Sequence, residues 1–136
     1  MKKPIVWNKE NVITNGIWII IGEIPNPGIF PVDKSVKAPR SMKHTRCLVE
    51  GEKRHIESWE DITLSEIGKK SVYDETLDGI VFSTQGGVFD MEHIEDCFYV
   101  AGIRQGEPVK IGVNASKIML IVKYKKLLLA IMGMEV

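Results

Sequence analysis

Apolar runs separated by turn-forming residues predict that the chain begins with antiparallel strands. The dipeptide Asn15-Gly16 separates two β-branched apolar stretches, residues 12–14 and 17–21. Asn-Gly between such stretches is typical of a two-residue type I′ hairpin turn, in which both central residues have positive φ. Residues 17–21 are continuously apolar, which predicts an interior strand that is covered on both faces or lies at a subunit contact. Residues 25–31 are rich in proline, which cannot donate to a sheet ladder, so they predict a loop.

The next part of the chain predicts a second hairpin. The residues Glu50-Gly51-Glu52 join two stretches, 45–49 and 53–59, that each mix apolar and polar positions. A short connection containing glycine between two such stretches favours antiparallel pairing. We therefore predict strands on both sides of Gly51.

One short helix is predicted near residues 60–67. Either Ser58 with Asp61 or Thr63 with Glu66 has the spacing of a capping box, and Gly68 stands after them as a stop. After this helix, Asp78-Gly79 leads into the β-rich stretch 80–84, which predicts a strand.

A longer helix is predicted over residues 88–101, after a break at Gly86-Gly87. Phe89, His93, Cys97 and Val100 fall along one helical stripe, and Gly102 stands where a helix would end. The predicted order is therefore strand, glycine turn and helix.

The last third predicts a strand and one more element whose type stays open. Residues 109–113 favour a strand, and Asn114 or Ser116 could cap the final element. Residues 117–132 are rich in Leu, Met, Ala and Lys, with no turn residue at 123–126, so helix is favoured and a hairpin is the alternative. As a helix, this segment would be apolar around most of its circumference, which predicts a homo-oligomer formed through residues 117–136.

These elements together predict a single α+β domain over residues 1–136. The expected arrangement is a mostly antiparallel β N-terminal two thirds with one or two helices in the C-terminal third. The length of 136 residues, 44% hydrophobic and 26% charged, fits one core of this kind.

The charge, hydropathy and cysteine content of the chain limit its expected partners and location. Eighteen basic residues balance eighteen acidic ones, so neither nucleic acid nor a membrane surface is an expected partner. The apolar stretch 118–134 is interrupted by three lysines, which disfavours a membrane span. Two cysteines without a CxxC pattern and no signal peptide predict reduced thiols and a cytoplasmic location.

One cluster has metal-ligand chemistry. In a helix, Asp90, His93 and Cys97 would stand at i, i+3 and i+7 on one face, with Asp96 beside them. Carboxylate, imidazole and thiolate bind Zn²⁺ or a similar divalent ion. The same stripe carries Phe89 and Val100, which favours a buried face with a hydrogen-bonded histidine and an inert cysteine over a metal site.

A second candidate is a run of basic residues without an intervening acid. Its cations could close over a phosphate or nucleotide, and guanidinium groups grip such anions bidentately. The alternative is a solvated connector. The residues concerned are Lys37, Arg40, Lys43 and Arg46, preceded by Lys34.

No common catalytic motif decides the function. The chain lacks GxxxxGK and GxGxxG loops, and neither cysteine stands in a recognisable nucleophile context. The leading hypothesis is a non-enzymatic cytoplasmic binding module without a cofactor, which recognises an anionic small ligand or a protein partner. The alternative is a small metal-dependent hydrolase in which Asp90, His93 and Asp96 or Cys97 hold the ion.

Overall fold

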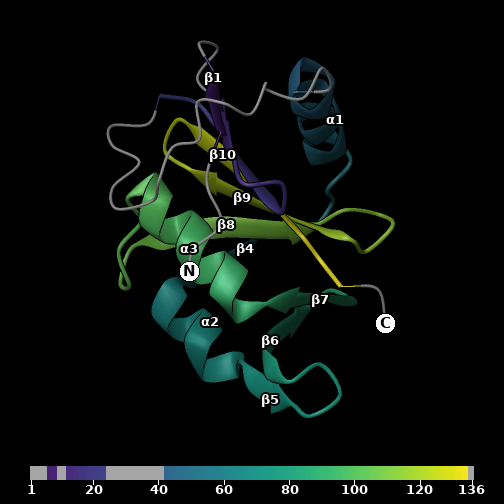
Figure 1. The fold of residues 1–136 in the computed structure, drawn as a ribbon, viewed down its shortest axis with the longest axis vertical. Helices are drawn as coiled ribbons and strands as arrows, with labels where there is room; N and C mark the ends of the chain where they lie inside the picture. The colour runs from purple at the N-terminus through teal and green to yellow at the C-terminus, as the bar shows by residue number, and fades with distance from the viewer. Residues whose placement is uncertain (1–5, 9–11, 24–41, 135–136) are drawn as a thin grey trace.

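The computed structural model describes residues 6–8, 12–23 and 42–134, and it has the predicted α+β architecture (Figure 1). These residues form ten strands in two antiparallel sheets, with three helices. The seven-stranded sheet has the order β1-β2-β3-β10-β9-β8-β4, and the three-stranded sheet has the order β5-β6-β7. The elements are β1 (Val6–Asn8), β2 (Val12–Thr14), β3 (Trp18–Ile21), α1 (Met42–Arg54), β4 (Glu60–Thr63), α2 (Leu64–Lys70), β5 (Val72–Asp74), β6 (Gly79–Thr84), β7 (Gly87–Asp90), α3 (Met91–Ala101), β8 (Pro108–Val113), β9 (Met119–Tyr124) and β10 (Leu127–Met132).

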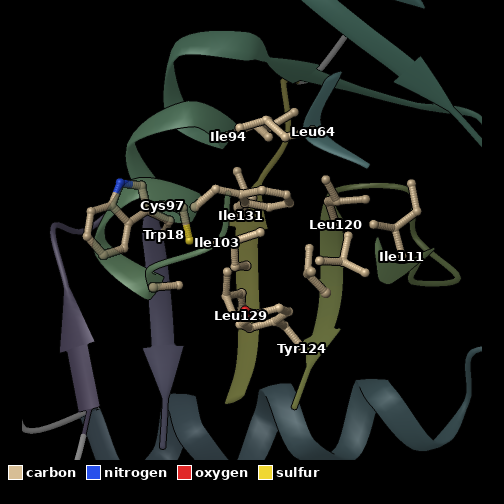
Figure 2. Packing of buried hydrophobic residues seen from close by; sticks show 14 of the residues in the cluster. Trp18, Leu64, Ile94, Cys97, Ile103, Ile111, Leu120, Tyr124, Leu129 and Ile131 are labelled. Atoms are coloured by element: carbon tan, nitrogen blue, oxygen red, sulfur yellow. The ribbon is translucent and has the colours of Figure 1, made fainter. Parts of the chain in front are cut away.

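The large sheet is covered on both faces because side chains alternate along its central strands. On one face, Trp18, Leu120 and Leu129 belong to a core shared with α2, α3 and the three-stranded sheet (Figure 2). On the other face, Ile19 and Ile121 pack with Val49 of α1. Figure 1 shows α1 on one side of the large sheet and α2 and α3 on the other. None of the three described helices combines the length and apolar character that a bilayer crossing requires.

The first predicted hairpin is confirmed, but its turn is of another type. β2 and β3 pair antiparallel, and β3 lies between β2 and β10 as an interior strand buried on both faces. Only Gly16 has positive φ in this turn; Asn15 does not, so the type I′ prediction was wrong. Instead, Asn15 Oδ1 accepts hydrogen bonds from the N–H groups of Ile17 and Trp18, at 2.9 and 3.0 Å. The predicted loop at residues 25–31 lies outside the described residues.

The second predicted hairpin was wrong, because residues 42–54 form helix α1. Tertiary packing explains the difference: Val49 is fully buried against the large sheet, while a Cβ at Gly51 on the same helix would meet open space. Helical spacing also brings Arg46 Nε within 3.3 Å of Glu50 Oε1. A glycine in a helix costs only about 1 kcal/mol relative to alanine, which the packing of Val49 offsets.

The short helix is confirmed with one of its two predicted caps. Thr63 caps α2, and Thr63 and Glu66 form a reciprocal capping box. The alternative cap was wrong, since Asp61 lies in strand β4. Gly68 does not end the helix, which continues to Lys70.

The helix predicted over 88–101 begins three residues later than expected. Gln85 and Gly86 both adopt positive φ and form a tight turn that pairs β6 with β7, so residues 87–90 are a strand. Asp90 is therefore the N-cap of α3 and not a residue within it. Gly102 ends the helix in the left-handed conformation, as predicted.

The last element is the hairpin and not the favoured helix. β9 and β10 pair in register around Lys125 and Lys126, and Lys125 takes positive φ although it is not a typical turn residue. Both strands are central in the large sheet and almost wholly buried within one chain. The apolar character that predicted self-association through 117–136 is therefore explained by burial on both faces, and assembly through this segment stays a prediction.

Candidate functional site

The residues with metal-ligand chemistry do not converge on a common point. Asp90 accepts a hydrogen bond from the N–H of Glu92 at 2.8 Å as a helix cap. His93 Nε2 lies 3.9 Å from Asp90 Oδ2, and Asp96 is half-buried further along α3. Among the described residues, no group of three or more His, Cys, Asp or Glu side chains could hold a metal ion. The geometry therefore lends no support to a divalent metal at Asp90, His93, Asp96 and Cys97, or to the metal-dependent hydrolase.

Cys97 is a core residue. It lies in the same apolar cluster as Trp18, Ile103 and Leu129 (Figure 2). Burial, with a smaller contribution from the charge of Asp96, raises the pKa of the Cys97 thiol well above its usual value. A buried, protonated thiol lacks both the thiolate form and the access that a nucleophile requires. The other cysteine, Cys47, is exposed on α1 and is not in a disulfide.

The predicted anion-binding residues are described only in part. Lys37 and Arg40 lie outside the described residues, and of Lys43 only its place in α1 is described. Arg46, also in α1, lies against Glu50. Ligand binding by Lys37, Arg40, Lys43 and Arg46 therefore stays a prediction.

The structure reveals a different group of cations, in a cleft at one corner of the large sheet. The cleft has a volume of about 510 Å³, within the range of small-molecule sites. It lies where β8 begins and β9 ends, beside β4. Its lining residues are Asp61, Glu107, Pro108, Val109, Lys110, Lys123, Tyr124 and Lys125.

Two of these lysines stand directly opposite each other on neighbouring strands. Lys110 of β8 and Lys123 of β9 are register partners, and Lys110 is also the partner of Asp61 in β4. Like charges directly opposite on a sheet repel by roughly 0.2–1 kcal/mol. Lys110 Nζ lies 3.0 Å from Asp61 Oδ1, and Lys123 Nζ lies 3.8 Å above the centre of the Trp59 ring. These contacts hold both ammonium groups at the surface without neutralising Lys123.

The third lysine belongs to a chain of polar contacts at the edge of the cleft. The Tyr124 hydroxyl donates to Glu107 Oε2, and the N–H of Arg104 donates to Glu107 Oε1 at 3.1 Å. The hydrogen bond from Tyr124, followed by that from Arg104, lowers the pKa of Glu107. Hydrogen bonding to Tyr124 and the nearby charge of Glu107 raise the pKa of Lys125. Lys125 and Glu107 are therefore both charged at neutral pH.

The cleft lies at the edge of the sheet face that α1 covers. Lys110 and Lys123 lie on the sheet face that α1 covers elsewhere, in line with Gly112 and Ile121. Ile56, just after α1, packs so closely on Gly112 that a Cβ there would lie 2.5 Å from Ile56 Cγ2. Trp59 also packs against the apolar cluster on this face, and the next register pair on the same face is Lys110 and Lys123 in place of Gly112 and Ile121.

Sequence reasoning missed this site because it placed Lys123 in a helix. The available signal was that Lys110 and Lys123 each interrupt an apolar run at strand spacing. Their pairing depends on the register between β8 and β9, which no local pattern specifies.

Comparisons with known proteins provide no further information on function. No protein-family model, no curated protein and no solved structure matches this chain.

Proposed function

We propose that this protein is a non-enzymatic binding protein that takes a small carboxylate- or phosphate-bearing anion in the cleft between β4, β8 and β9. The observation that carries the proposal is the in-register pair Lys110 and Lys123. An anion placed between two ammonium groups converts their mutual repulsion into two attractive, charge-assisted contacts.

The charge balance of the cleft supports the same conclusion. Three lysines face two carboxylates in the lining, which leaves an excess of positive charge. Asp61 and Glu107 are already engaged by Lys110 and Tyr124. Lys123 is held against an aromatic ring, which leaves its charge available. A small anion fits this balance better than a long polyanion, since the chain as a whole is neutral.

Thermal-shift measurements at low ionic strength test the proposal. Inorganic phosphate, pyrophosphate, citrate and ATP are suitable probes, because low salt limits the screening of surface charges. A probe present at a hundred times its dissociation constant stabilises the fold by about 2.7 kcal/mol. We expect at least one probe to raise the melting temperature by several degrees, and we expect Lys110→Met or Lys123→Met to remove most of that increase.

The matched control is Lys53→Met, which removes an exposed lysine from the end of α1. It should leave the increase unchanged. A rise in melting temperature that persists in both cleft variants but disappears in Arg40→Met or Arg46→Met would contradict anion binding in the cleft. It would favour binding by the run of basic residues predicted from the sequence. The absence of any response to the four anions would contradict anion binding itself.

A further inference from the structure

The three-stranded sheet carries an exposed apolar patch at its outer edge. Tyr73, Leu77 and Ile80 are 60%, 41% and 52% exposed, and we name this group the hairpin patch. Val72, which is 62% exposed, lies on the opposite face of β5. Tyr73 and Ile80 are direct cross-strand partners, so their side chains lie together on one face. Other exposed large apolar residues in the described ranges are scattered, at Leu48, Tyr99 and Met132. A cluster of this kind marks a contact surface.

The patch lies on a strand that has an open edge. β5 is the outermost strand of its sheet in the described part of the chain, and it pairs only with β6. Soluble proteins usually protect such edges by keeping them short or by placing charges, proline or bulges in the strand. β5 is short and ends in Asp74, but its other two residues, Val72 and Tyr73, are exposed and apolar, and its turn projects from the body of the molecule (Figure 1). This edge is suited to accept an additional strand.

The charges at the two ends of β5 are complementary to those of a second copy of the same strand. Lys69 and Lys70 end helix α2 one residue before the strand, Asp74 is the last residue of β5, and Glu75 follows it. An antiparallel copy of the same segment, centred on Tyr73, would set the basic end of each copy beside the acidic end of the other. A two-fold interface requires this kind of self-complementary pattern.

We propose that two copies of this chain associate by antiparallel pairing of their β5 edges, with the hairpin patches packed together. The pairing extends each three-stranded sheet across the two-fold axis. The contact area is small compared with the roughly 1,600 Å² of a standard stable interface, so the dimer forms in a concentration-dependent equilibrium. This proposal is independent of the anion site.

A charge exchange tests the pairing directly. Lys70→Glu and Glu75→Lys each place like charges at both ends of the symmetric interface, and each is expected to weaken the dimer about tenfold. An equimolar mixture of the two variants restores opposite charges at both ends and should recover the wild-type affinity. Sedimentation velocity over a concentration series measures all of these states. Lys70 also lies 3.4 Å from Glu60, but this exposed contact contributes little to folding.

The control is Lys53→Glu, on the opposite face of the large sheet, which should leave the dimer unchanged. A wild-type chain that stays monomeric up to about 1 mM overturns the proposal and leaves the patch to a different protein partner. Dimerisation that neither reversal weakens, or that the mixture fails to restore, also overturns it.

Discussion

Phe98→Ala is expected to lower the free energy of unfolding by about 3–5 kcal/mol, the usual cost of removing a buried phenylalanine ring. Phe98 is fully buried on α3, in the cluster that joins this helix to the large sheet. The loss combines the transfer free energy of the ring with the cavity that remains, because helix and sheet backbones relax only in part. Urea denaturation monitored by circular dichroism measures it.

The neighbouring residue provides the control for this prediction. Tyr99 follows Phe98 on the same helix but is largely exposed, so Tyr99→Ala should cost less than about 1 kcal/mol. Phe98→Leu keeps most of the buried volume and should lie between the two, which keeps the comparison measurable if the alanine variant is too unstable to purify. Equal effects of Phe98→Ala and Tyr99→Ala would show that α3 is not packed as described.

Asn114→Ala is expected to lower the free energy of unfolding by about 2–4 kcal/mol, since it leaves two backbone donors without their acceptor. Asn114 is 3% exposed and lies in the turn between β8 and β9. Its Oδ1 accepts from the N–H groups of Ile118 and Met119, at 3.1 and 3.0 Å. The same turn sets the register that places Lys110 opposite Lys123, so the variant should also weaken anion binding.

Ser116→Ala is the matched control for Asn114. The Ser116 hydroxyl accepts from the Asn114 side-chain amide at 3.0 Å, but Ser116 is exposed and water can replace it. We expect a loss below about 0.5 kcal/mol in the same denaturation experiment. A loss for Asn114→Ala no greater than this would mean that the turn does not depend on the buried amide.

The parts of the fold that were predicted correctly depend on short-range chemistry. Asn15-Gly16 marked a hairpin, Thr63 and Glu66 formed the predicted capping box, and Gly102 ended a helix. In each case, the residues that determine the structure are at most a few positions apart, so one sequence is sufficient to recognise them.

The errors occurred where distant packing decided the outcome. The segment around Gly51 became a helix because Val49 is buried against strands far away in the sequence. Residues 117–132 became a hairpin because both of its strands are central and need apolar residues on two faces. Helix and strand are hard to distinguish in a continuously apolar segment, since neither periodicity is visible there.

The candidate site has the same non-local origin. Lys110 and Lys123 are brought together by strand register, and Lys123 is held in place by Trp59, from the segment after α1. The residues singled out from spacing alone, Asp90, His93 and Cys97, instead cap a helix, lie beside that cap and fill the core. Spacing along one helix identified a shared face without showing whether that face is buried.

Amide chemical shifts in a ¹⁵N-labelled chain titrated with pyrophosphate test the anion site most directly. We expect saturable changes concentrated in residues 108–110 and 123–125, which line the cleft, with α1 unaffected. Lys123→Met should abolish saturation at the same concentrations. Changes concentrated in residues 42–54, or a linear drift without saturation, would contradict anion binding in the cleft.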